Sequence, residues 1–193
     1  MRPVALVLWC HAAVLVALAP EPPALRRASA PAKPEKPEKP WIRTAARVRV
    51  AAPQADCYAA YAGLERMPEW CPMLRSVSWR DRSRGVSEWR MGYRGVSVGW
   101  TAETLEEAPP QLLRWKSRAG VPNFGVATFA DAGAGATDCE VALSYQMPRV
   151  LSDIVETPRV QRFIARLLER TLLAFGRIME AEHDAGGAAA TGT

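Results

Sequence analysis

The chain has 193 residues, a formal net charge of +5, four cysteines and only two histidines, His11 and His183. The first 40 residues hold six basic and three acidic side chains, so the rest carries only about +2, whereas a nucleic-acid binder shows a basic surface on its folded domain. We therefore expect no nucleic-acid binding. The cysteines form no CxxC pair and have no histidine cluster beside them, which argues against a zinc site and against a Cys-His or Ser-His catalytic pair. We also expect no cofactor, and we expect free, buried thiols rather than a disulfide framework.

The first 42 residues are expected to be a leader and not part of the core. Residues 1–19 have the layout of a signal peptide, with a basic start and the apolar run Val4–Leu18. Residues 20–42 are rich in proline and have little apolar surface to bury, so we expect them to be unfolded. A signal followed by such a leader predicts delivery to a plastid. The alternatives are a secreted or endomembrane protein with a proline spacer, and an uncleaved anchor.

The next part of the chain reads as one strand, one short helix and a run of further strands. Residues 44–51 alternate as a strand, and a short helix near Cys57 follows the turn at Pro53. Apolar residues then recur with a period of two between short turns, which predicts antiparallel pairing. These predicted strands are Met73–Asp81, Ser87–Arg94, Val96–Glu107, Leu112–Ser117, Phe124–Ala130 and Cys139–Met147.

A long amphipathic helix is predicted from Thr157 to Glu182, because apolar residues recur there every three or four positions. Thr157 followed by Pro158 is a helix start signal. Gly186 and Gly187 predict its end, so residues 185–193 are expected to be a disordered tail. A helix with one apolar stripe must pack on another apolar surface. The sequence thus predicts one α+β domain, residues 43–184, with about seven antiparallel strands in a curved sheet around the helix.

Strand alternation predicts which side chains face that helix. Trp89, Met91 and Tyr93 share one face of their strand, whereas Glu88 and Arg90 share the other. The neighbouring predicted strands repeat this division, with aromatic and aliphatic residues on one face and polar residues on the other. One side of the sheet is therefore expected to be apolar and the other solvated.

Several segments resemble a known family. They are Met67–Trp70, Trp89–Met91, Trp115–Ser117, Gly120–Gly125 and Ser144–Pro148. Together with the order of elements, they resemble the polyketide cyclase/dehydrase and lipid-transport family, the START-like (SRPBCC) helix-grip group that includes coenzyme Q-binding COQ10-type domains. The resemblance covers about residues 43–182. Within it, the run from Trp115 to Gly125 is similar to plastid-type members of the family from plants and cyanobacteria. It implies a hydrophobic cavity between sheet and helix that holds a lipid, an isoprenoid quinone or a polycyclic aromatic.

Eight residues are candidates for contact with such a ligand. They are Trp70, Tyr93, Trp100, Trp115, Asn123, Phe124, Tyr145 and Gly176. Each has a structural alternative: a tryptophan on an inner face is often core, an asparagine after proline often caps a turn, and a helical glycine often marks close packing.

Three functional hypotheses follow. The first is a carrier that binds a hydrophobic small molecule and presents it. The second is an aromatase, cyclase or dehydratase that templates a reactive substrate, with no residue assigned to proton transfer. The third is an interaction module whose apolar side binds a partner's helix or a membrane edge. In the membrane version Arg159, Arg162, Arg166 and Arg170 face anionic lipid, and the alternative is that they form a solvated helix face. The oligomeric state does not follow from the sequence.

Overall fold

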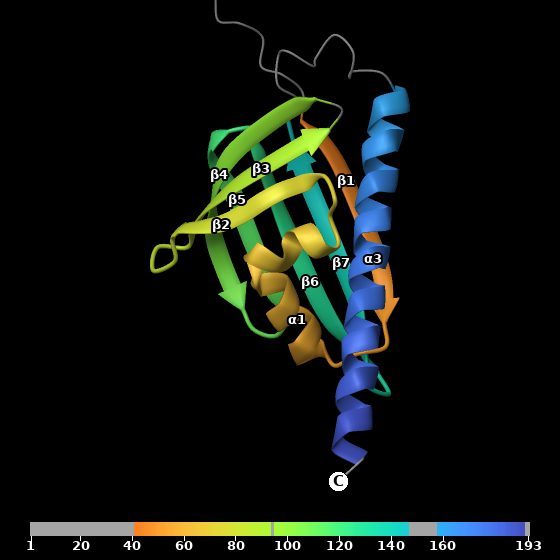
Figure 1. Ribbon diagram of the computed structural model, residues 1–193. Coiled ribbons are helices and arrows are strands. Elements are labelled where there is room, and N and C mark those ends of the chain that lie inside the picture. Colours follow the sequence, from red (N-terminus) through yellow and green to blue (C-terminus); the bar gives the residue numbers. More distant parts are fainter. Residues whose placement is uncertain (1–40, 94, 147–157, 192–193) are drawn as a thin grey trace, which may run out of the picture. The chain divides into compact units, whose positions relative to one another are not determined.

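The computed structural model describes residues 41–93, 95–146 and 158–191 (Figure 1). The predicted signal peptide and almost all of the predicted leader lie outside this range, as does Thr157. All seven strands form one antiparallel sheet in the order β1-β7-β6-β5-β4-β3-β2. The strands are β1 (Ile42–Val50), β2 (Leu74–Asp81), β3 (Val86–Tyr93), β4 (Val96–Ala108), β5 (Leu112–Gly120), β6 (Asn123–Gly133) and β7 (Ala136–Tyr145).

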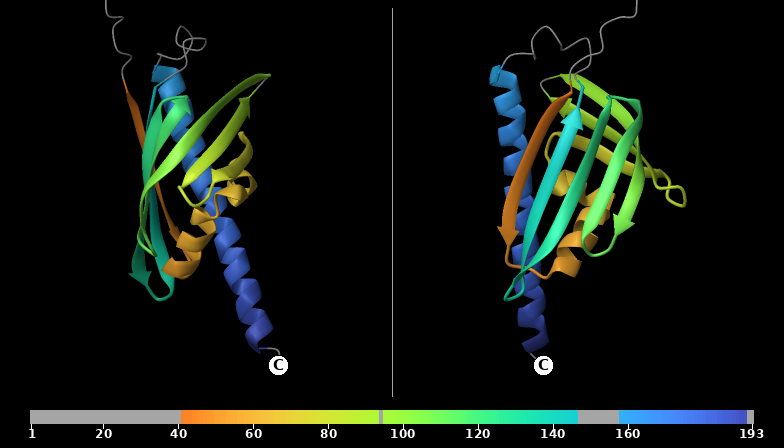
Figure 2. Two further views of the ribbon diagram at one scale, coloured as in Figure 1. Left: turned by 90° about the vertical axis from the view of Figure 1, so that its left-hand side faces the viewer. Right: turned by 180° about the vertical axis from the view of Figure 1, so that it is seen from behind.

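The sheet is curved, and three helical segments pack on the same face of it (Figure 2). Helix α1 (Gln54–Ala62) and the short 3-10 helix η2 (Leu64–Glu69) connect β1 to β2, which are the two edge strands. The face that these segments cover is called the inner face below, and the opposite face is called the outer face. The predicted fold class, a curved antiparallel sheet with a long C-terminal helix, is confirmed.

Helix α3 (Pro158–Thr191) lies along the edge strand β1 (Figure 1). At Gly176 the two elements approach closely: a Cβ atom there would lie 3.3 Å from Val50 Cγ2 and 3.6 Å from Val48 Cγ2. The predicted end of this helix is wrong, because α3 continues through Gly186 and Gly187 to Thr191. Glycine costs a helix only about 1 kcal/mol relative to alanine, and three alanines, the best helix formers, follow directly.

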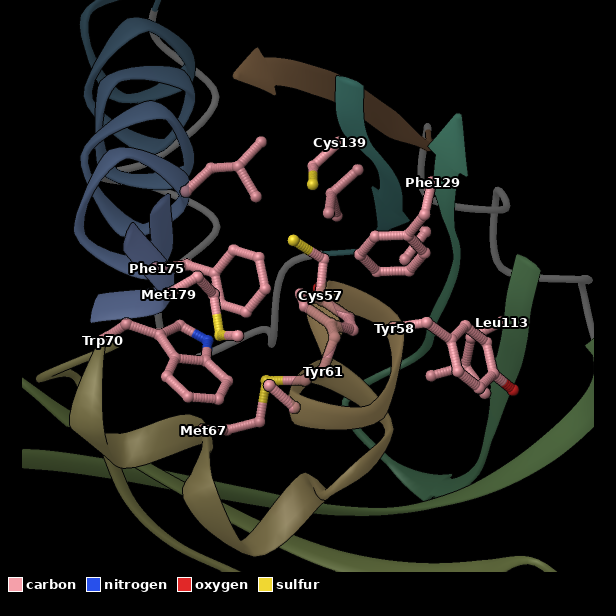
Figure 3. Packing of buried hydrophobic residues seen from close by; sticks show 14 of the residues in the cluster. Cys57, Tyr58, Tyr61, Met67, Trp70, Leu113, Phe129, Cys139, Phe175 and Met179 are labelled. Carbon is pink, nitrogen blue, oxygen red and sulfur yellow. The ribbon is translucent and has the colours of Figure 1, made fainter. Parts of the chain in front are cut away.

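The main core lies where α1, η2 and α3 meet the inner face (Figure 3). Phe175 of α3 is fully buried between the rings of Trp70 and Tyr61, at centroid distances of 5.1 and 5.6 Å. The rings of Tyr61 and Phe129 of β6 pack edge to face, with their centroids 5.6 Å apart. Cys57 and Cys139 are buried in the same cluster as free thiols, and Cys71 is also free, as predicted.

Candidate functional site

Three tryptophans line the inner face of β3, β4 and β5. Trp89 and Trp100 are register partners, and their rings stack with centroids 5.7 Å apart and an interplanar angle of 13°. Trp89 Nε1 donates a hydrogen bond of 2.8 Å to Ser87 Oγ, which orients the indole ring. The side chains of Trp89, Met91, Trp100 and Trp115 face inward, and all four are only partly buried. We call these four residues the aromatic face.

The ring of Trp115 lies across a glycine of the next strand. A Cβ atom at Gly125 would come within 2.2 Å of Trp115 Cζ2, so only glycine leaves room for this ring position. Trp115 and Gly125 are register partners on β5 and β6. The indole ring of Trp115 therefore lies directly against the backbone of Gly125 on the inner face.

Tyr145 and Asn123 are paired across β7 and β6 beside this face. Tyr145 is 6% exposed, and its hydroxyl has no hydrogen-bond partner among the described residues. Burial raises the pKa of Tyr145 to about 12, so the phenol stays protonated at neutral pH and is a donor. Asn123 Nδ2 donates to the Val121 carbonyl at 2.9 Å, and the Asn123 N–H donates to Ser117 Oγ at 2.9 Å, which ties down this turn.

The two ends of the inner face differ in how well they are filled. Around α1 the inward side chains are buried, for example Phe129 and Cys139 at 3% and 0% exposure. At the other end the aromatic face and Leu143 stay partly exposed, and so do Ile164 and Leu167 of α3. Apolar side chains that face inward without being covered are a surface that a hydrophobic ligand can cover.

The structure places the eight candidates in different surroundings. Trp100, Trp115, Asn123 and Tyr145 lie together on the inner face, whereas Trp70 is 1% exposed within the core. Gly176 lies against β1. The side chain of Tyr93 lies outside the described residues. A ligand contact by any of these residues stays a prediction.

The expected inward position of Phe124 is wrong. Asn123 and Gly125 are buried on the inner face, so strand alternation turns Phe124 outward. There it is 40% exposed and packs on Trp41 with a centroid distance of 5.1 Å. The candidate set also omitted Trp89 and Met91, although both belong to the aromatic face. Their alternation with Glu88 and Arg90 was the signal that assigned them to the inner side.

The described residues hold no cluster of histidine, cysteine, aspartate and glutamate able to bind a metal ion. Among the helices of the described ranges, none is long and apolar enough to cross a membrane.

A curved seven-stranded antiparallel sheet with a long C-terminal helix defines a helix-grip protein. The family model for polyketide cyclase/dehydrase and lipid transport matches residues 50–168, which is more than half of the chain. The chain belongs to this family. Its members act on polyketides or carry lipids, so hydrophobic small molecules are the ligands of the family.

Solved structures show the same fold. A protein from Deinococcus radiodurans is 25% identical, with a TM-score of 0.57, and the match covers 72% of this chain and 98% of that one. The Zhui aromatase/cyclase from a Streptomyces species is 17% identical, with a TM-score of 0.60 and coverage of 80% and 100%. A START superfamily protein from Mycobacterium smegmatis is 15% identical, with a TM-score of 0.56 and coverage of 74% and 97%. No curated protein matches the chain.

Proposed function

We propose that this domain binds a hydrophobic small molecule on the aromatic face and carries or presents it. The observation that carries the proposal is the partial exposure of inward-facing tryptophans at one end of the sheet, in a domain whose other end is well packed. Covering about 150 Å² of apolar surface contributes roughly 4 kcal/mol, which offsets part of the cost of association. The ligand is therefore expected to be largely apolar and at least partly planar.

Tyr145 narrows the proposed ligand to one that carries a carbonyl or similar acceptor. A buried hydroxyl without a partner costs free energy, and an acceptor on the ligand would recover that cost. An isoprenoid quinone, the ligand class of the COQ10-type domains that the sequence resembles, joins a planar ring, two carbonyls and an apolar tail. It is the ligand that we prefer over a lipid or a polycyclic aromatic without such groups.

Replacing Tyr145→Phe tests this role. We expect unfolding stability to be unchanged or higher, because a buried hydroxyl without a partner is removed, and affinity for decylubiquinone to fall about two- to tenfold. Thermal unfolding and calorimetric titration measure the two effects.

Tyr58→Phe is the matched control, since the Tyr58 hydroxyl is also buried without a partner but lies in the packed core beside Phe129. This variant should bind like the wild type. Equal affinities of all three proteins would contradict the role of Tyr145, and a wild type that takes up neither quinone nor extracted lipid would contradict the carrier function itself.

The alternative function, a cyclase or dehydratase, has less support from the residues of the site. The one histidine among the described residues is His183. It is exposed near the C-terminal end of α3 and is not part of the aromatic face. Tyr145 with a pKa of about 12 is a poor general base at neutral pH. Turnover of a polyketide analogue by the purified protein would favour the enzyme.

We further propose that residues 1–42 direct the protein to a plastid, with secretion as the alternative. The support is the signal-like start and the proline-rich leader in the sequence. A fusion of residues 1–42 to a fluorescent protein should accumulate in plastids of a host that has them. Accumulation in the medium would instead establish secretion.

A further inference from the structure

The outer face of β2 to β5 carries two hollows that share Thr101. The first has a volume of about 440 Å³, and the second has a volume of about 260 Å³. The lining of the first includes Glu88, Arg90, Gly99 and Thr101, which alternate with the stacked tryptophans along β3 and β4, and it also includes Trp89 and Trp100 themselves. The second is lined by Arg80, Asp81, Arg84, Val86, Thr101 and Arg118. The second hollow has no residue of the aromatic face in its lining.

Two of the arginines in the second hollow are placed there by irregular strand pairing. Arg80 is the unpaired residue where the register of β2 shifts against β3, and Arg118 is the unpaired residue where β5 shifts against β4. Arg84 comes from the turn between β2 and β3. Such β-bulges turn one side chain away from regular alternation, and they are common beside functional sites. Three separate segments therefore bring a guanidinium to one hollow, which we call the arginine groove.

The charges of this groove are poorly compensated compared with the rest of the outer face. At the β1 edge, Arg47 pairs with Glu140, and Arg49 makes bonds of 2.9 and 3.0 Å to Asp138. By contrast, Arg80, Arg84 and Arg90 form no ion pair with any residue in the described ranges, and the Arg118 Nε is 3.6 Å from Glu103 Oε2. The outer face is therefore neutralised at one edge and cationic at the other.

The acidic residue in the lining of the groove, Asp81, already accepts hydrogen bonds from its own turn. Asp81 Oδ1 accepts hydrogen bonds from Ser83 Oγ at 2.7 Å and from the Arg84 N–H at 3.2 Å. These bonds hold the carboxylate within the turn between β2 and β3. Thr101, at the junction of the two hollows, adds a hydroxyl to the lining.

We infer that the arginine groove binds a phosphate group, with the rest of the ligand extending past Thr101 into the larger hollow beside Arg90. A guanidinium presents a rigid fork of N–H donors, and three such forks from different directions match a group with three or more acidic oxygens better than a carboxylate with two. The phosphate belongs either to a soluble phosphate ester or to a phospholipid headgroup. The arginine groove shares no lining residue with the aromatic face, and phosphate binding in the groove does not depend on the proposed hydrophobic ligand.

Calorimetric titration of the full chain with inorganic phosphate at constant ionic strength tests the site. We expect saturable binding that weakens about tenfold or more in the double variant Arg80→Gln, Arg84→Gln, because two charge-assisted contacts are lost. The matched control is Arg170→Gln, Arg177→Gln, which removes the same charge from exposed positions of α3 and should change affinity less than about twofold. Decylubiquinone uptake should be the same in all three proteins.

Sedimentation with phosphatidylcholine vesicles, with and without phosphatidic acid, separates the two sources of phosphate. Binding that requires phosphatidic acid and is lost in the groove variant would identify a lipid headgroup. Binding of free phosphate without vesicle binding would identify a soluble ester. The proposal is overturned if neither probe binds, or if both double variants lose affinity equally.

Discussion

Replacing Phe175→Ala should destabilise the domain by about 3–5 kcal/mol, a large part of the stability of a domain of this size. Phe175 has no exposed surface, and its ring fills the space between Trp70 of η2 and Tyr61 of α1. Removing it leaves a cavity at the point where α3 joins the two short helices to the sheet. Urea unfolding followed by circular dichroism measures the loss.

Leu173→Ala is the control on the same helix, since Leu173 is 39% exposed on the other side of α3. It should cost less than about 1 kcal/mol. An equal loss of unfolding free energy in the two variants would contradict the packing of Phe175 against η2 and α1.

Replacing both stacked tryptophans, Trp89→Leu and Trp100→Leu, should lower affinity for decylubiquinone by about five- to hundredfold. Each aromatic contact contributes about 0.5–1.5 kcal/mol beyond the area that it covers, and leucine keeps the apolar character without the flat ring. Because the two rings are only partly buried, the fold should survive the change. Calorimetry measures the affinity, and thermal unfolding checks the fold.

Trp41→Leu is the matched control for this pair. Trp41 is 42% exposed and packs on Phe124 on the outer face, so its replacement should leave quinone affinity unchanged. A loss of affinity in this control that equals the loss in the double variant would place the ligand elsewhere and contradict the proposed site.

Local periodicity was sufficient to predict the fold class and to assign residues of the aromatic face to the inner side of the sheet. The period of two placed Trp89 and Met91 on the inner face, and the period of 3.6 placed Phe175 on the packed side of α3. Phe124 was misplaced because it was grouped with the other aromatic residues as a candidate and was not assigned by strand alternation. The inner position of Asn123 itself decides that Phe124 points outward.

The arginine groove could not be predicted from the sequence. In the sequence, Arg80 alternates like an ordinary strand residue with a solvated side chain, and Arg118 follows the end of the predicted strand Leu112–Ser117. Their convergence depends on two register shifts, one of β2 against β3 and one of β5 against β4. A single sequence carries no local signal for such shifts.

The position of α3 beside β1 has a consequence for association between copies of the chain. β1 is hydrogen-bonded to β7 alone, so its other edge has backbone groups able to pair with a foreign strand. The long helix lies alongside this edge (Figure 2) and hinders such pairing. Any event that detaches α3, whether truncation, loss of Phe175 or strong denaturant, therefore also exposes a template for aggregation. The helix that packs on the inner face thus also limits strand pairing between copies of the chain at this edge.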